Sequence, residues 1–115
     1  KETYSSIQKI KKTLNVKTHV FDKIFDQNLK IDYCKIDAQG EDFKILKGMK
    51  KNLKLGNIKL LKVEICFPDM HKNVVGSHLD ILNFLKKLNY ELFSIGKIKY
   101  KNNAILFMDA FFKKN

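Results

Sequence analysis

Arginine and tryptophan are both missing from this sequence, and all 23 of its basic residues are lysine. Arginine is the residue that recognises phosphate and guanine through paired hydrogen bonds. Its absence argues against a nucleic-acid partner, although the formal net charge is +11. Two interpretations of the charge stay open, namely solvated lysine faces and an acidic partner such as a glycan or a membrane surface.

Long apolar runs and paired cysteine motifs are also missing. No apolar run approaches the roughly 20 residues that a membrane span needs, and the first residues, KETYSSIQKIKK, lack a signal-peptide core. Cys34 and Cys66 lie within apolar runs, so we predict buried thiols in a reducing, cytoplasmic compartment. His19, His71 and His78 show no ligand spacing with them, so no metal site is predicted.

Glycine is scarce, and the five glycines stand apart in the sequence. No pair of them forms a loop of the kind that cradles a phosphate or a cofactor. With 115 residues and 44% hydrophobic residues, the chain is long enough for one domain and too short for two. It begins with Lys1 rather than Met, which suggests a start inside a longer protein.

The apolar periodicity predicts an open α/β sheet. Helical segments are predicted over residues 5–14, 23–27 (capped by Asp22) and 41–53, and from Ser77 onward; strands are predicted over 16–21, 31–37, 58–67, 90–95 and 104–112. Alternating strands and helices imply parallel strands joined by right-handed crossovers, and the last two strands suggest an antiparallel hairpin. Ligands of such sheets bind beyond the carboxyl ends of the strands.

The stretch KIDAQGEDFKILKG, residues 35–48, ends an apolar strand on an acid. Asp37 falls at the carboxyl end of that strand, and Gly40 permits a tight turn into the next helix. Asp42 lies in the first turn of this helix, where negative charge is favourable. Glu64 occupies the matching place in the next strand, so two carboxylates would flank one crevice. These residues alone do not say which reaction the crevice serves.

The same stretch resembles the signature of the FkbM family of S-adenosylmethionine-dependent methyltransferases, roughly K-I-D-V-E/Q-G-x-E-x-x-V-L-x-G. Asp42 stands where the family has glutamate, and Ile45 where it has valine. The residues that match are Lys35, Ile36, Asp37, Gln39, Gly40, Leu46 and Gly48. The flanking segments also resemble the family, over about residues 16–110: Val20-Phe21-Asp22, Val63-Glu64-Ile65 and HLDILNFLKKLNYELFSI.

This resemblance implies a Rossmann-like class I methyltransferase sheet, of which residues 1–115 form the C-terminal half. The chain would carry strands four to seven with the terminal antiparallel hairpin, entered through residues 1–15. The implied activity is transfer of a methyl group from S-adenosylmethionine to a hydroxyl of a sugar or secondary metabolite. The alternative is a non-catalytic remnant or basic interaction module, because the family's cofactor loop, a D-x-G-x-x-x-G turn, is absent.

The resemblance also directs attention to particular side chains. Asp37 and Glu64 are the candidates for orienting or deprotonating the acceptor hydroxyl. Asp37 could instead bind the amides of its own turn, and Glu64 could pair with Lys35 or Lys62.

Gln39, Gly40 and His71 are the candidate substrate contacts, although Gln39 could cap the next helix and His71 could be a surface residue. The cofactor-binding residues stay unknown, and the chain alone is expected to be inactive. The strand over 31–37 would have paired with an upstream strand, so its open edge predicts either marginal stability of the chain alone or a homo-oligomer.

Overall fold

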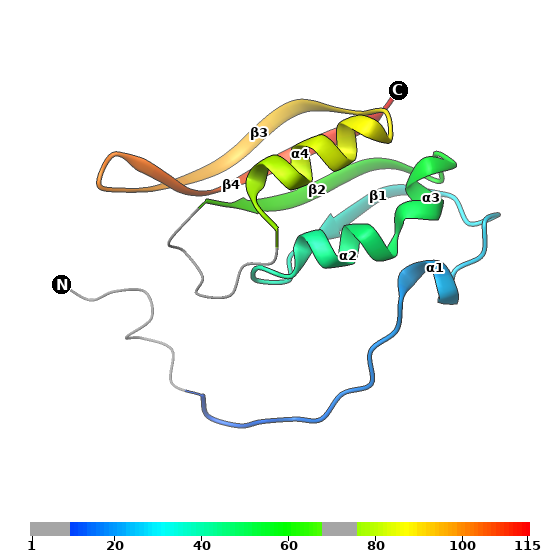
Figure 1. Ribbon diagram of the computed structural model, residues 1–115, viewed down its shortest axis with the longest axis horizontal. Helices are drawn as coiled ribbons and strands as arrows, with labels where there is room; N and C mark the ends of the chain where they lie inside the picture. The colour runs from blue at the N-terminus through cyan, green and yellow to red at the C-terminus, as the bar shows by residue number, and fades with distance from the viewer. Residues whose placement is uncertain (1–9, 68–75) are drawn as a thin grey trace.

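The computed structural model describes residues 10–67 and 76–115, which form one mixed sheet with helices packed on it (Figure 1). The strands are β1 (Ile31–Ile36), β2 (Ile58–Cys66), β3 (Tyr90–Lys101) and β4 (Ala104–Lys114). The helices are α1 (Phe21–Ile24), α2 (Asp42–Gly48), α3 (Lys50–Lys54) and α4 (His78–Lys87).

The sheet has the strand order β1-β2-β4-β3. β1 and β2 are parallel, and β4 lies antiparallel between β2 and β3. The predicted parallel pair and the predicted terminal hairpin are therefore both confirmed, and β4 is the antiparallel strand of the sheet. The hairpin closes through Asn102 and Asn103, whose φ angles of 52° and 62° are those of a two-residue turn that follows the twist of its strands.

One face of the sheet is buried under α2, α3 and α4, which lie over it in Figure 1. Alternate residues of β2, namely Leu61, Val63 and Ile65, are fully buried on this face. They pack with Leu85 of α4 and Phe112 of β4 in a continuous apolar core. Burial of this surface is the main favourable contribution to folding, at about 25 cal/mol per Å² of apolar area.

The helix predicted over 41–53 is interrupted at Met49 and forms α2 and α3. Asp22, which was expected to cap its own helical turn, caps α3 instead. Its carboxylate accepts hydrogen bonds from the backbone amides of Lys51 (2.7 Å) and Asn52 (3.2 Å) and from the Asn52 side chain (2.7 Å). Because these two amides bond to Asp22 rather than to the preceding helical turn, the helix restarts after Met49.

The N-terminal predictions are largely wrong. Residues 10–20 contain no strand or helix, so the strand expected over 16–21 is absent, and Val16 is 75% exposed. Alternating β-branched residues form a strand only where a neighbouring strand and a buried face stabilise them. The helix expected over 5–14 is likewise absent from residues 10–14, and the rest of it lies outside the described residues.

The predicted start of α4 is confirmed. The Ser77 hydroxyl accepts a hydrogen bond from the Asp80 amide at 3.2 Å, and the Asp80 carboxylate accepts one from the Ser77 amide at 2.8 Å. This reciprocal pair satisfies two amides that the first helical turn leaves free. The local sequence therefore determines this helix end without help from distant residues.

β1 forms one edge of the sheet, because β2 is its partner among the described residues. The exposed strand edge on which the predicted association rests is thus present, and association itself stays a prediction.

Cys66 is buried as expected, and burial raises the pKa of its thiol to about 12, whereas Cys34 is only partly buried. Along the described segments, no helix has the length and apolar character to cross a membrane.

The capping of α3 by Asp22 gives a first prediction. Asp22→Ala should lower the free energy of unfolding by about 2 kcal/mol, because it leaves the buried Asn52 amide without its closest acceptor. Urea denaturation measures the change. Asp26→Ala is the matched control, since Asp26 accepts only an exposed turn bond from Asn28 and should cost less than about 0.5 kcal/mol. Equal losses for the two variants would contradict the capping role.

Candidate active site

A hollow of about 200 Å³ lies on the face of the sheet opposite the core. All four strands contribute to it because the register brings Lys35 beside Lys62 and Glu64 beside Asp109. Its lining residues are Lys35, Ile36, Asp37, Lys62, Glu64, Lys97, Phe107 and Asp109. The structure thus brings Asp37 and Glu64, the two carboxylates singled out from the sequence, to one hollow.

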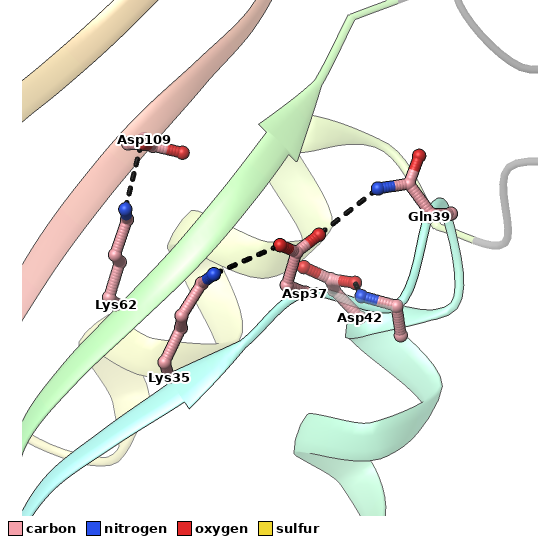
Figure 2. Close-up of polar contacts among 7 residues, drawn as sticks. Lys35, Asp37, Gln39, Asp42, Lys62 and Asp109 are labelled. Atoms are coloured by element: carbon pink, nitrogen blue, oxygen red, sulfur yellow. Dashed lines mark hydrogen bonds and ion pairs between the residues drawn. The ribbon is translucent and has the colours of Figure 1, made fainter.

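Asp37 directly follows β1, and its side chain is 39% exposed. It forms an ion pair with Lys35 at 3.1 Å and accepts a hydrogen bond from the Gln39 side chain at 3.1 Å (Figure 2). The hydrogen bond from Lys35 holds the pKa of Asp37 below its ordinary value. Asp37 is therefore an ionised carboxylate and a poor proton acceptor near neutral pH.

The turn after Asp37 is closed by Asp42 rather than by Asp37. The Ala38 amide donates to Asp42 Oδ1 at 2.8 Å, and Asp42 is only 3% exposed (Figure 2). Gly40 has a φ of 100°, a backbone conformation that favours glycine, which confirms its predicted part in the tight turn. The alternative in which Asp37 binds amides of its own turn is therefore not observed. Asp42 binds the Ala38 amide of this turn instead.

Glu64 has a different environment from Asp37. Burial raises the pKa of Glu64, and the charge of Asp37 raises it further, while a hydrogen bond from the Cys66 thiol lowers it. The thiol lies 3.7 Å from Glu64 Oε1. Among the described residues Glu64 forms no ion pair, because Lys35 pairs with Asp37 and Lys62 pairs with Asp109 at 2.9 Å. Of the two carboxylates, Glu64 is the better proton acceptor.

Two of the other sequence candidates, Gln39 and Gly40, do not line this hollow. Gln39 is bonded to Asp37 and does not cap α2, whose first turn follows Glu41. Gly40 lines a second, much smaller cavity of about 10 Å³, which Glu64 also borders. His71 lies outside the described residues, and no group of three or more metal-ligating side chains occurs within the described part of the chain.

Sequence reasoning missed Asp109 and Lys97. Asp109 interrupts the apolar run AILFMDAFF in the same way that Glu64 interrupts LLKVEICF, so the same signal could have identified it. Lys97 carried no such signal, because it is one of 23 lysines and follows a glycine that was read as the end of a strand.

Comparison with known proteins places the chain in a family. The sequence model of the methyltransferase FkbM domain matches residues 1–92, which is more than half of the chain. The chain therefore belongs to the FkbM methyltransferase family, and the family implies a Rossmann-like methyltransferase fold. No curated protein and no solved structure matches the chain significantly.

The family uses S-adenosylmethionine, and the described residues do not fit this group. The larger hollow is smaller than the roughly 300–1,000 Å³ of pockets that enclose drug-sized ligands. The glycines with positive φ, Gly40, Gly56 and Gly76, each lie in a separate turn rather than in one shared loop. We therefore assign no cofactor contact and no step through the cofactor to the residues described.

The proximity of the two carboxylates gives a second prediction. Asp37→Asn should lower the pKa of Glu64, because the substitution removes a negative charge that disfavours ionisation of Glu64. Carbon-detected NMR of the side-chain carboxyl during a pH titration measures the change. Asp32→Asn is the control, since Asp32 pairs with Lys59 and does not line the hollow. An unchanged pKa in Asp37→Asn would show that the two groups do not interact.

A third prediction concerns the cofactor. The chain by itself should bind S-adenosylmethionine weakly or not at all in calorimetry, because the described residues offer no cradle for it. A dissociation constant in the micromolar range would show that the cofactor site has been misplaced. S-adenosylhomocysteine, which lacks the positive charge of the sulfonium, serves as the control for non-specific charge effects.

Proposed function

We propose that this chain forms the acceptor side of a methyltransferase that transfers the methyl group of S-adenosylmethionine to a hydroxyl. The observation that carries the proposal is Glu64, a partly buried carboxylate that forms no ion pair with the described residues and shares a hollow with Asp37. A hydroxyl becomes a good nucleophile when a positioned base accepts its proton. The family membership supplies the reaction type, and a sugar or a secondary metabolite is the proposed acceptor class.

In this proposal the two carboxylates have separate roles. Glu64 accepts the proton of the acceptor hydroxyl, since its raised pKa brings its proton affinity closer to neutral pH. Asp37 stays ionised through Lys35 and acts by charge, keeping the proton affinity of Glu64 high and orienting the acceptor. The Gln39 side chain donates a hydrogen bond to Asp37 Oδ1, the carboxylate oxygen that Lys35 does not pair with. We therefore assign Gln39 a positioning role.

Gly40 and His71 have weaker support as substrate contacts. Gly40 shapes the turn that places Asp37, and it borders the small cavity beside Glu64. It therefore acts on the acceptor through the position of Asp37. His71 stays a proposal from the sequence, because its segment lies outside the described residues.

A non-catalytic basic module is the second candidate function. The net charge of +11 and the lack of a cofactor cradle among the described residues favour it. In such a module Glu64 would be an incidental polar group, and its replacement would leave function unchanged. The two candidate functions therefore predict opposite effects of replacing Glu64.

The fourth prediction separates these candidates. Glu64→Gln should slow methyl transfer by at least about 100-fold, because the amide cannot accept the hydroxyl proton. The measurement is turnover by the complete enzyme that carries this chain. Glu91→Gln is the control, since Glu91 is an exposed residue of β3 outside the hollow. Full activity in Glu64→Gln would remove the general-base role.

The pH profile tests the role of Asp37 in the same assay. The rate should fall as pH drops through the raised pKa of Glu64, because the protonated acid cannot act as a base. In Asp37→Asn this acidic limb should move to lower pH, and turnover should fall far more than cofactor affinity. An unmoved limb with full turnover would reduce Asp37 to a residue of the turn.

A further inference from the structure

The charged side chains around the hollow are not all neutralised. Lys35 pairs with Asp37 at 3.1 Å, and Lys62 pairs with Asp109 at 2.9 Å. Lys97, the third lysine that lines the hollow, forms no ion pair with the described residues. Among the described residues, Lys97 is therefore a lysine at the hollow whose ammonium group is available to a ligand.

A β-bulge directs Lys97 toward this hollow. Ile95 pairs with Ala110 and Ile98 pairs with Met108, so Gly96 and Lys97 together lie opposite Asp109 alone. In a regular strand these two residues would alternate between the faces of the sheet. The extra residue lets Lys97 line the hollow on the uncovered face. Bulges of this kind are frequent beside active sites, where they redirect a side chain.

Gly96 is the residue that permits this arrangement. A Cβ atom at position 96 would lie 3.0 Å from Cε2 of Phe111 and 3.4 Å from Cβ of Asp109. A side chain there would press on the wall of the hollow beside the Lys62–Asp109 pair. The glycine thus leaves room for the Phe111 ring and the Asp109 side chain beside Lys97.

We propose that Lys97 is a specificity residue that binds an anionic group, a carboxylate or a phosphate, on the molecule whose hydroxyl lies at Glu64. This inference rests on the proposed function and extends it, because it assigns the acceptor a negative charge. An ammonium group has three donors and no acceptor, so it is suited to anionic oxygens. Hydrogen bonds between charged groups are about twice as strong as neutral ones.

The size and the charges of the hollow agree with this assignment. A hollow of about 200 Å³ takes part of an acceptor rather than a complete drug-sized ligand. Because Lys35 and Lys62 are paired with Asp37 and Asp109, Lys97 is the lysine of the hollow that has no ion pair among the described residues and can bind the anionic group. The hydroxyl end would then lie toward Glu64 of β2, which β4 separates from β3 and Lys97.

NMR titration of the chain tests the proposal with three probes: methyl glucuronide, glucose phosphate and the neutral methyl glucoside. At least one anionic probe should bind about tenfold more tightly than methyl glucoside. Lys97→Gln should remove this preference. Lys101→Gln is the matched control, since Lys101 ends the same strand and lies outside the hollow, and it should retain the preference.

The results distinguish the possible acceptor classes. They also show whether the role of Lys97 is wrong, independently of the role of Glu64. Preference for glucuronide over glucose phosphate assigns a carboxylate, and the reverse preference assigns a phosphate. Equal binding of all three probes, no binding of either anionic probe, or equal losses in the two lysine variants would overturn the role of Lys97. None of these results bears on the proton acceptor, which is tested separately by turnover of Glu64→Gln.

Discussion

The site depends on one partly buried hydrogen bond, the one that the Ala38 amide donates to Asp42 Oδ1. A carboxylate that is 3% exposed is costly to bury unless its oxygens have partners. The bond offsets part of that cost and ties the start of α2 to the residue that follows Asp37. It therefore fixes where β1 ends and where Asp37 enters the hollow. Without this constraint the turn would be free to move, and the two carboxylates would not be held beside the same cavity.

The alternation of side chains along the strands separates stability from function. In β2 the residues Leu61, Val63 and Ile65 face the helices, while Lys62 and Glu64 face the hollow. Because adjacent residues of a strand point to opposite faces, a slip of one residue would exchange the apolar set with the charged set. The apolar core thus determines the register, and the register determines which charges meet. Glu64 lies opposite Asp109 of β4 for the same reason that Val63 lies opposite Ala110.

The sequence predicted the elements whose signals are local. The strands over 31–37 and 58–67 and the capped start of α4 follow from apolar runs and from the Ser77–Asp80 pair, which act over a few residues. The break at Met49 was not predictable, because it depends on Asp22, about 30 residues away in the chain. The site shows the same division. Asp37 and Glu64 are acids in apolar runs, whereas Lys97 is placed by a bulge whose register depends on pairing with β4.

The proposed roles of the two carboxylates rest on their surroundings, because both are acidic side chains of similar chemistry. An exposed acid beside an ammonium is stabilised in its charged form, and a partly buried acid near another carboxylate is stabilised in its neutral form. Lys35 gives Asp37 the first environment, and partial burial together with the charge of Asp37 gives Glu64 the second. The two groups are therefore coupled, since the lysine that keeps Asp37 charged also maintains the charge that raises the proton affinity of Glu64. In the proposed role, this pair of carboxylates needs one fixed charge and one exchangeable proton. One residue separates Lys35 from Asp37, so both lie on the face of the sheet where Glu64 lies.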